Sequence, residues 1–574
     1  MRPFTRRSFL AGVAALVAAG CADDERPSGS SNPTIPGSWS PFPGDTVSVR
    51  TSSAPTSASA ATNPSSQEPE HGSTSVDETA ATPTSSLAPL APVDFADPFT
   101  LGVASGDPDA TSVVLWTRLA PDPVHGGGMP GDDVPVRWEL GRDEAFTTVD
   151  RAGDTTAPAE HAHAVHVTVE LDPGDWWYRF RVGQHTSVPG RTSAAPAPDA
   201  PVDRLTFASA SCQNYEAGYY AAHRDLAEQR PAFVMWLGDY IYEAAAGAAG
   251  PGSVRAHDGP EATDLDGYRR RYALYKTDTD LQAAHRACPW FVIWDDHEVQ
   301  DNYAGVVPKD PAQAATFPAR RAAAYQAWWE HMPVRLPAPT GLADPAAEYR
   351  TYRDAQWGDL LGLALLDGRQ YRSDQACGDA ILDLAPPCAE LTAPGRTMLG
   401  AAQEQSLDAR LGAWGTTWNV LGNQTVLTDL TVLGAVINYD QWDGYPAERA
   451  ALLDHLATAA VPNVVVLTGD IHVSIVGQLR SGSRATGAPV GVEFVCSSIS
   501  SGSFLSSTYA PAMSLIPDIV DLELEHRGYV LHTVTRDEWR AEYRLVTDAH
   551  LVDSPVTSHA TYVVPAGTSQ VHRE

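Results

Sequence analysis

Residues with metal-binding side chains follow several apolar segments of this sequence, at the point where each segment ends. They are Asp239, Tyr242, Asp296, His297, Asp470 and His472. Short apolar runs such as 233–237 (FVMWL) predict strands that are buried on both faces. Ligands bind at the carboxyl ends of the strands in open α/β sheets, so we expect these side chains to meet in one site.

Two further strand ends carry residues of the same kind. Cys212 ends the segment 205–212 (LTFASASC), and Asn423 follows the segment 418–422 (WNVLG). A site made of carboxylates alone would favour Mg²⁺ or Ca²⁺, whereas imidazole, phenolate and thiolate donors favour a transition metal. The mixed donor set therefore favours a transition metal.

Asp239 has candidate ligands on both sides and could bridge two ions. Two metal ions at about 3.5–4 Å clamp an in-line displacement at phosphorus, with activated water as the nucleophile. In this scheme Asp296 is a ligand and His297 donates a proton to the leaving oxygen.

Each position also has a structural interpretation, which stays open at this point. Asp239 is compatible with a helix N-cap. Cys212 is compatible with a buried structural thiol, the commoner role of a lone cysteine. Asn423 is compatible with a turn amide, and Asp296 with His297 are compatible with a solvated turn.

The segment 201–550 alternates apolar strands with amphipathic helices, for example near 216–229 and 264–286. This alternation predicts an α/β domain with a largely parallel central sheet. The preceding segment 93–200 consists of short alternating strands separated by turn residues, which is typical of a small β-sandwich. Residues 551–574 are interpreted as a C-terminal tail.

The N-terminal segment 1–21 is predicted to be a twin-arginine export signal. Arg6 and Arg7 precede an apolar run that is too short to span a bilayer. Cys21 closes the run and is a candidate for lipidation, a choice that stays open. The segment 22–92 is rich in Ser, Thr, Pro and Ala and predicts a disordered linker.

The composition limits the possible partners. Lys and Arg number 39 against 71 Asp and Glu, so the formal net charge is −32. A chain this acidic is not expected to bind nucleic acid through bulk charge. Beyond Cys21 the number of cysteines is odd, and Cys377 and Cys388 are close enough in sequence to pair in an oxidising compartment.

The motifs GDYIYE (238–243), WDDHE (294–298) and TGDIH (468–472) resemble those of the calcineurin-like metallophosphoesterases. Cys212, and Asp in place of His in the last motif, resemble the PhoD-like branch. The N-terminal segment FTLGVASGDPDATSVVLWTRL and SSISSGS (497–503) fit the same branch. The resemblance implies a four-layer α/β sandwich preceded by a fibronectin- or immunoglobulin-like domain.

The resemblance also implies the metals and their ligands. A ferric ion would be held by Cys212, Asp239, Tyr242 and His472. One or two calcium ions would share Asp239 and use the remaining candidates, which are Asp296, Asp470 and, less surely, Asn423.

The expected function is an exported alkaline phosphatase or phosphodiesterase, a monomer that hydrolyses phosphate esters. Its expected place is outside the cell membrane, either secreted or tethered through Cys21. Two alternatives remain: phospholipase D-type activity on lipid head groups, and a non-catalytic surface protein. The loops 244–262 and 371–400 would select the substrate, and their sequences do not identify it.

Overall fold

The computed structural model describes residues 88–574, except 343, 345–346, 383–384, 485, 504, 506–508 and 514. These residues belong to one structural unit, Glu78–Glu574. The predicted export signal, Cys21 and most of the predicted linker lie outside the described residues. Within the described part of the chain, no helix is long and apolar enough to cross a membrane.

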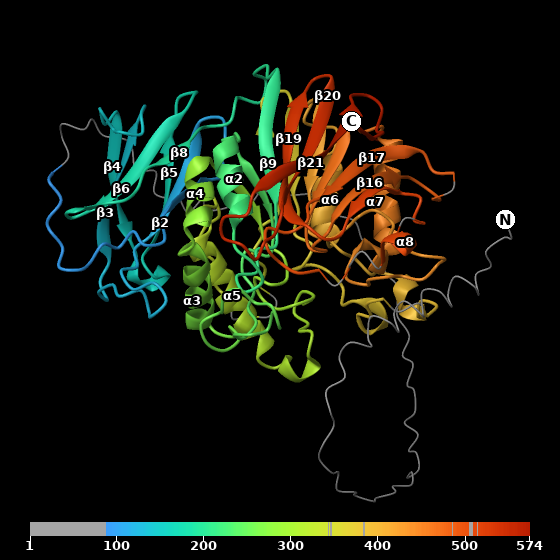
Figure 1. Ribbon diagram of the computed structural model, residues 1–574, viewed down its shortest axis with the longest axis horizontal. Coiled ribbons are helices and arrows are strands. Elements are labelled where there is room, and N and C mark those ends of the chain that lie inside the picture. The colour runs from blue at the N-terminus through green and yellow to red at the C-terminus, as the bar shows by residue number, and fades with distance from the viewer. Residues whose placement is uncertain are drawn as a thin grey trace, which may run out of the picture. The chain divides into compact units, whose positions relative to one another are not determined.

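The larger of two stacked sheets has ten strands, and most of its strands come from the two ends of the described chain (Figure 1). In spatial order they are β22 (His572–Arg573), β21 (Val556–Pro565), β20 (Glu538–Val546), β19 (Arg527–Thr535), β9 (Arg204–Ala210), β10 (Val234–Leu237), β11 (Trp290–Ile293), β1 (Val103–Gly106), β2 (Ser112–Arg118) and β5 (Ala164–Glu170). The strands β9, β10 and β11 are parallel, whereas β19 joins β9 in antiparallel pairing.

The second sheet has seven strands. In spatial order they are β12 (Arg353–Trp357), β13 (Leu361–Leu365), β14 (Trp418–Gly422), β15 (Val464–Thr468), β17 (Pro489–Val495), β16 (Ser474–Arg480) and β18 (Ile519–Glu523). Its centre, from β13 to β17, is parallel. The single central sheet suggested by the alternation of strands and helices is therefore two mixed sheets.

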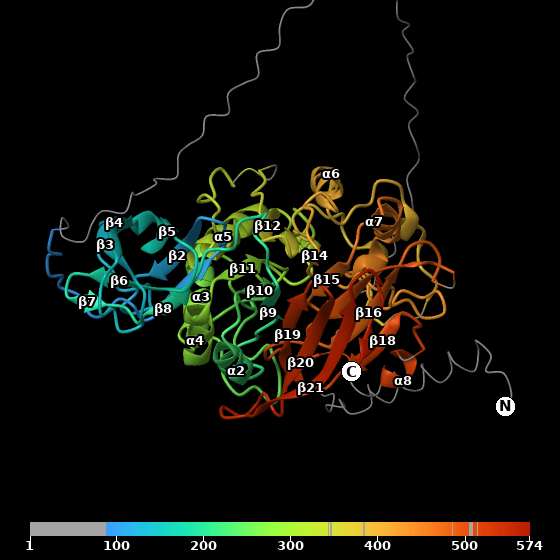
Figure 2. The ribbon, with the colours of Figure 1, turned by 90° about the horizontal axis from the view of Figure 1, so that it is seen from above.

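The two sheets pack face to face, with helices on their outer faces (Figures 1 and 2). Phe207, Met235 and Phe291 of the first sheet meet Val420 and Val465 of the second in one buried core. Side chains on the opposite faces of these strands pack against the helices, as alternation along a strand requires. This arrangement confirms the expected four-layer α/β fold.

The helices divide between the two outer faces. Aromatic and apolar residues of α2 (Ala221–Gln229), α3 (Leu265–Lys276), α4 (Thr279–Ala287) and α5 (Phe317–His331) cover the first sheet. Those of α6 (Ala401–Arg410) and α7 (Pro446–Thr458) cover the second. A short helix, α8 (Ala510–Met513), precedes β18. Single 3₁₀ turns occur at η2 (Ala159–His161), η3 (Pro311–Gln313), η4 (Ala376–Gly378), η5 (Ala389–Thr392) and η6 (Trp442–Gly444).

The N-terminal β-rich region is a sandwich that shares one of its sheets with the α/β layers. A five-stranded sheet, formed by β4 (Arg151–Ala157), β3 (Val134–Gly141), β6 (Trp176–Val182), β7 (His185–Thr186) and β8 (Gly190–Thr192), packs on β1, β2 and β5. Since β1 pairs with β11, those three strands also extend the ten-stranded sheet. Local alternation predicts such strands but does not identify their partners.

The prediction that residues 551–574 form a C-terminal tail is wrong. Residues 556–565 form β21, which pairs along its length with β20, and β22 pairs with β21. Tyr562 and Val564 are buried in the core between the sheets. The segment TSHATYVVP alternates in polarity only in part, which is why it was not recognised as a strand from sequence.

Candidate metal and active site

The predicted site residues lie at the carboxyl ends of strands from both sheets. Cys212 follows β9, Asp239 follows β10, and Asp470 with His472 follows β15. These four residues all have positive φ angles, between 56° and 63°. Left-handed backbone is uncommon outside glycine and costs free energy, and such strain clusters at functional sites.

The first set of side chains at this edge is named here the Cys212 group and consists of Cys212, Asp239, Tyr242 and His472. One ligand atom from each of Cys212, Asp239 and His472 lies within 4.8 Å of the others. The Tyr242 hydroxyl lies 2.8 Å from Asp239 Oδ2 and 2.8 Å from His472 Nε2. The sequence therefore selected four residues that the fold brings into contact.

The hydrogen bonds of the Cys212 group determine which atoms face its centre. His472 Nδ1 donates to the Gly502 carbonyl at 2.6 Å, so the lone pair of Nε2 points toward Tyr242. Burial, reinforced by the nearby Asp239 carboxylate, raises the pKa of Cys212 and that of Tyr242 well above their ordinary values. Thiol and phenol therefore keep their protons unless a cation displaces them.

The second set is named here the Arg369 group and consists of Arg369, Asp295, Asp296, Asp440 and Asp470. The Arg369 guanidinium is fully buried and donates to Asp295, to Asp440 Oδ1 at 2.8 Å and to Asp470 Oδ1 at 2.8 Å. Its Nη2 also lies 3.3 Å from Asp296 Oδ1. Four carboxylates thus surround Arg369, and Asp440 Oδ1 also lies 3.2 Å from Arg372 Nη2.

The charges of the Arg369 group depend on this cation. Burial acts to lower the pKa of Arg369, but the surrounding carboxylates raise it well above its ordinary value. Burial acts to raise the pKa of Asp296, yet Arg369 and His297 hold it below its usual range. For Asp470 burial prevails over Arg369 and raises the pKa to about 7.

His297 lies between the two groups and forms a buried pair with Glu243. Its Nδ1 is 2.7 Å from Glu243 Oε2, which leaves Nε2 as the nitrogen nearer the site. Burial acts to lower the pKa of His297, but Glu243, Asp296 and Asp239 raise it well above the ordinary value. The imidazole is therefore held as a proton-carrying cation, as a general acid requires.

The donor set fits metal ions. Asp239 Oδ1 is buried and has no hydrogen-bond partner among the described residues, although a buried carboxylate oxygen is costly to leave without one. Asp239 belongs with Cys212 and His472 in one set of candidate ligands and with Asp296 and His297 in another. An orphaned oxygen between thiol, phenol, imidazole and carboxylate donors matches the place of a bridging ligand.

Asn423 is buried at the end of β14, but its hydrogen bonds point elsewhere. Its Nδ2 donates to the Thr425 carbonyl, and its Oδ1 accepts from Trp442 Nε1 at 3.3 Å. Its role as a ligand therefore stays a prediction.

Three residues of this region were missed from sequence as site residues. Glu243 and Glu298 stand inside the motifs GDYIYE and WDDHE, and Arg369 follows the strand β13. Glu298 is buried and accepts from the amides of Asp239 and Asp295, so it fixes the turns that carry candidate ligands. The sequence contains one signal for these residues, because each of them lies after a strand. An arginine at such a position is not a metal ligand and does not by itself indicate a site.

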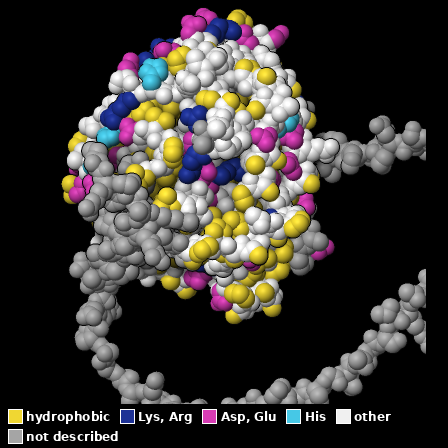
Figure 3. All heavy atoms as spheres, turned by 90° about the vertical axis from the view of Figure 1, so that its right-hand side faces the viewer, with side chains coloured by type: hydrophobic (Ala, Val, Ile, Leu, Met, Phe, Trp, Pro, Cys, Tyr) yellow, Lys and Arg dark blue, Asp and Glu magenta, His cyan; other side chains and the backbone are white. Residues whose placement is uncertain are grey.

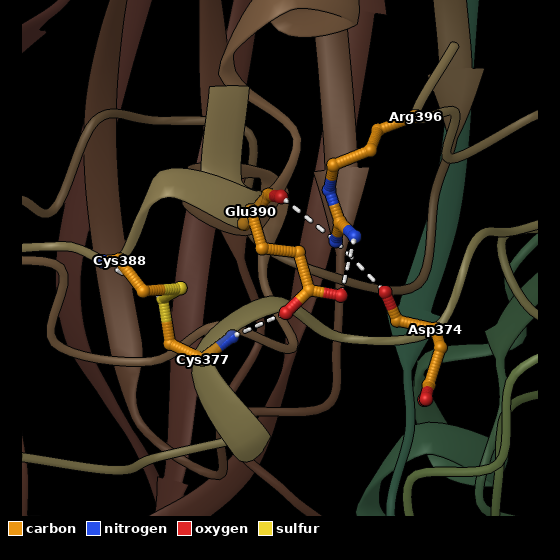
Figure 4. The surroundings of a disulfide bond; sticks show 6 residues. Asp374, Cys377, Cys388, Glu390 and Arg396 are labelled. Carbon is orange, nitrogen blue, oxygen red and sulfur yellow. Dashed lines mark hydrogen bonds and ion pairs between the residues drawn. A yellow bond between two sulfur atoms is a disulfide. The ribbon is translucent and has the colours of Figure 1, made fainter. Parts of the chain in front are cut away.

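The disulfide Cys377–Cys388 closes a short loop (Figure 4). Glu390 accepts from the Cys377 amide at 3.3 Å and lies 3.8 Å from Arg396 Nη1, which stabilises the loop.

A hydrogen-bond relay connects this loop to the candidate ligands. Asn302 donates through Nδ2 to Asp379 at 2.6 Å and through its amide to Asp296 Oδ2 at 2.6 Å. Gln375 donates to Asp440 Oδ1 at 2.6 Å. The disulfide Cys377–Cys388, which the sequence left open, is therefore present. The loop that it closes lies next to hydrogen bonds that reach Asp296 and Asp440 of the Arg369 group.

Comparison with known proteins gives consistent results. Residues 207–543 match the family model of the PhoD-like phosphatase, and residues 85–196 match that of the PhoD-like phosphatase N-terminal domain. Alkaline phosphatase D of Bacillus subtilis (strain 168) is 42% identical over 477 residues, covering 81% of this chain and 80% of that protein. A solved structure described as the structure of PhoD superposes with a TM-score of 0.80 at 41% identity, covering 84% of this chain and 93% of that one.

The fold, the site and these matches define a phosphoesterase, a hydrolase of phosphate esters. The chain belongs to the PhoD-like phosphatase family. The resemblance found in the motifs is thereby confirmed, and the alternative of a non-catalytic surface protein is set aside.

Proposed function

We propose that the chain is an exported, metal-dependent phosphoesterase that hydrolyses phosphomonoesters or phosphodiesters. The observation that carries the proposal is the convergence of Cys212, Tyr242 and His472 on Asp239, whose free oxygen is buried. The Cys212 group would hold Fe³⁺, and Asp239, Asp296 and Asp470, with Asn423, would hold Ca²⁺. When bound, the ions would supply Lewis-acid chemistry at the phosphoryl group and at a water molecule.

The residues of the chain have distinct roles in this proposal. Glu243 orients His297 and stabilises its protonated form, so Nε2 carries the proton for the departing alkoxide. The Gly502 carbonyl fixes the tautomer of His472, as outer partners of ligating histidines do. Arg369 keeps the neighbouring carboxylates in place and favours the ionised form of Asp296.

Metal removal and reloading test the proposal. Full-length protein stripped by chelation should lose turnover of 4-nitrophenyl phosphate and bis(4-nitrophenyl) phosphate, and Fe³⁺ with Ca²⁺ should restore it. Turnover that survives complete removal of metal would contradict the proposal. A panel with a phospholipid and a phosphodiester polymer then separates phosphatase from phospholipase D-type activity.

Colour is an independent measurement. A ferric ion bound to phenolate and thiolate donors should give a visible absorption band, which Tyr242→Phe should shift or remove. Tyr219→Phe is the matched control, because that phenol is bound to the Val254 carbonyl and lies outside the Cys212 group. A colourless protein with full metal content would show that Tyr242 and Cys212 do not bind iron.

Export is a separate part of the proposal and rests on Arg6 and Arg7 before a short apolar run. Replacing both with lysine should retain the protein in the cytoplasm. Mass analysis of the exported protein shows whether Cys21 carries a lipid. Equal export of the double variant would eliminate the twin-arginine route.

A further inference from the structure

A cavity of about 500 Å³ lies between the N-terminal sandwich and helix α3, apart from the candidate metal site. Its wall is formed by the end of β2, the loop 123–129, the turn around η2 and the start of α3. No residue of the Cys212 or Arg369 group lines it. Three arginines line it instead: Arg118, Arg269 and Arg270.

Arg118 is a nearly buried cation with one nitrogen left for a ligand. Its Nε donates to the Ala162 carbonyl at 3.0 Å, and its Nη1 is 2.9 Å from His331 Nε2. Burial holds the pKa of His331 well below its usual range, so that ring is neutral and accepts. Nη2 has no hydrogen bond to any described residue, and the side chain lines the cavity.

A glycine run keeps this nitrogen accessible. Gly126, Gly127 and Gly128 have φ angles of 85°, 85° and 72°, which side chains rarely adopt. A Cβ on Gly127 would lie 3.5 Å from Arg118 Nη2, whereas one on Gly126 would meet nothing within 4 Å. The loop therefore presents bare backbone to the cavity where a side chain would cover the guanidinium.

The two arginines of α3 differ in their partners. Arg269 is committed, because its Nε donates to Glu330 at 2.6 Å and its Nη2 to the Glu160 carbonyl at 3.1 Å. Arg270 is partly exposed and forms no ion pair within 4 Å in the described part of the chain. Arg118 and Arg270 are thus two cations available to one cavity.

Acidic residues limit the size of the ligand. Asp258 and Asp266 line the same cavity and are exposed. Their charges disfavour a long polyanion that would pass over them, but not a small anion held between Arg118 and Arg270. Guanidinium groups bind tetrahedral oxyanions through charge-assisted hydrogen bonds.

A second cavity is also lined by arginines, but these arginines are all paired with acidic residues. It measures about 70 Å³, and each of its arginines is bound to an aspartate: Arg449 to Asp443, Arg480 to Asp518 and Arg484 to Asp429. Basic and acidic side chains are also intermixed on the face drawn in Figure 3. The first cavity therefore differs from the second, because its Arg118 and Arg270 form no ion pair within 4 Å among the described residues.

We propose that this cavity is a second anion site, which binds one phosphate group away from the metal site. The group is either inorganic phosphate, the product of the reaction, or the phosphate of a small monoester. A loop connects the cavity to the reaction centre, since Asp258 belongs to the segment that starts after Glu243, and the Ala262 amide donates to the Glu243 carbonyl at 2.8 Å.

The test measures phosphate binding to metal-free, full-length protein by calorimetry. Arg270→Ala should weaken binding by about tenfold or more, the usual size of a charge-assisted contact. Arg286→Ala, which removes an arginine of α4 outside the cavity, is the matched control and should bind as wild type. Unchanged binding in Arg270→Ala, or no binding by wild type, would overturn the proposal.

Further measurements separate the ligand sources and guard against misfolding. A parallel titration uses glycerol phosphate in place of inorganic phosphate. The compound whose binding is weakened by Arg270→Ala identifies which of the two kinds of ligand the cavity takes. Arg118→Gln should weaken the same titration, with circular dichroism as the check of folding. Metal-loaded Arg270→Ala should turn over 4-nitrophenyl phosphate at the wild-type rate, which distinguishes this cavity from the reaction centre.

Discussion

The Cys212 group and the Arg369 group lie at the same edge of the stacked sheets but solve the problem of buried charge differently. In the first, burial favours neutral thiol and phenol, and no arginine or lysine belongs to the group. In the second, Arg369 already neutralises part of the carboxylate charge. A cation must therefore displace protons from the first group, whereas at the second it competes with an arginine.

The largest effect should come from His297, which lies between the two groups and belongs to neither. His297→Ala should lower turnover by about 10²–10⁴-fold, the usual contribution of a general acid, while the content of both metals stays unchanged. Metal analysis and kcat on the same preparation provide the measurement. Loss of metal together with activity would make His297 a ligand.

A variant of its partner tests the role of His297 more finely. Glu243→Gln removes the carboxylate that raises the pKa of His297, so the alkaline limb of the pH–rate profile should move to lower pH. An unmoved limb would indicate that another group supplies the proton.

The next effect should be confined to the first group. Cys212→Ser should weaken iron binding by more than the roughly 10–100-fold that loss of an outer partner costs, because a hydroxyl is a poorer ligand. Calcium content should remain near that of wild type. Iron equal to wild type would mean that Cys212 is a structural thiol.

The third effect should be confined to the second group. Arg369→Met should destabilise the metal-free protein by about 3–5 kcal/mol, since it leaves buried carboxylates without their cation. Calcium should recover part of that loss, because the ion replaces the missing charge. Thermal unfolding with and without calcium measures the difference.

Two variants control this experiment. Arg449→Met removes a half-buried arginine that is paired with Asp443 and belongs to neither group, and its destabilisation should not depend on calcium. Arg369→Lys keeps the charge and should lie between wild type and Arg369→Met. An equal loss for Arg369→Met with and without calcium would refute the neutralising role.

The smallest effect should be a slope in the pH dependence of stability. Burial raises the pKa of Asp470 from its ordinary value of 3.8 to about 7 in the folded protein. The folded state thus binds more protons between these values, and the free energy of unfolding of metal-free protein should fall as pH rises from about 4 to about 7. Asp470→Asn should flatten this slope, and an identical slope in the variant would assign it to other groups.

The sequence was sufficient to predict which candidate ligands meet in one place, but not the residues that surround them. Cys212, Asp239 and His472 could be chosen because each follows an apolar strand and is a familiar ligand. Arg369 also follows a strand, but its role becomes visible only when the fold places four aspartates from three segments around it. The role of Glu243 likewise becomes visible only when the structure places its carboxylate next to His297.

The fold shows the same limit. Hydrophobic runs predicted most core strands, and the family resemblance predicted the layers. Local periodicity does not encode the pairing between distant segments. That pairing divides the strands into two sheets and joins β1, β2 and β5 to the ten-stranded sheet.

The pairing of β9 with β19 determines when, during synthesis of the chain, the Cys212 group can be completed. Val530 lies opposite Ser209, so the strand that ends near Cys212 is completed by a segment made more than 300 residues later. Ser501, which donates to the Cys212 carbonyl and to the Tyr242 hydroxyl, is also synthesised late. A chain still on the ribosome therefore lacks a finished first group, and iron should enter only after release. Pulse-labelled chains truncated before residue 527 should bind no iron.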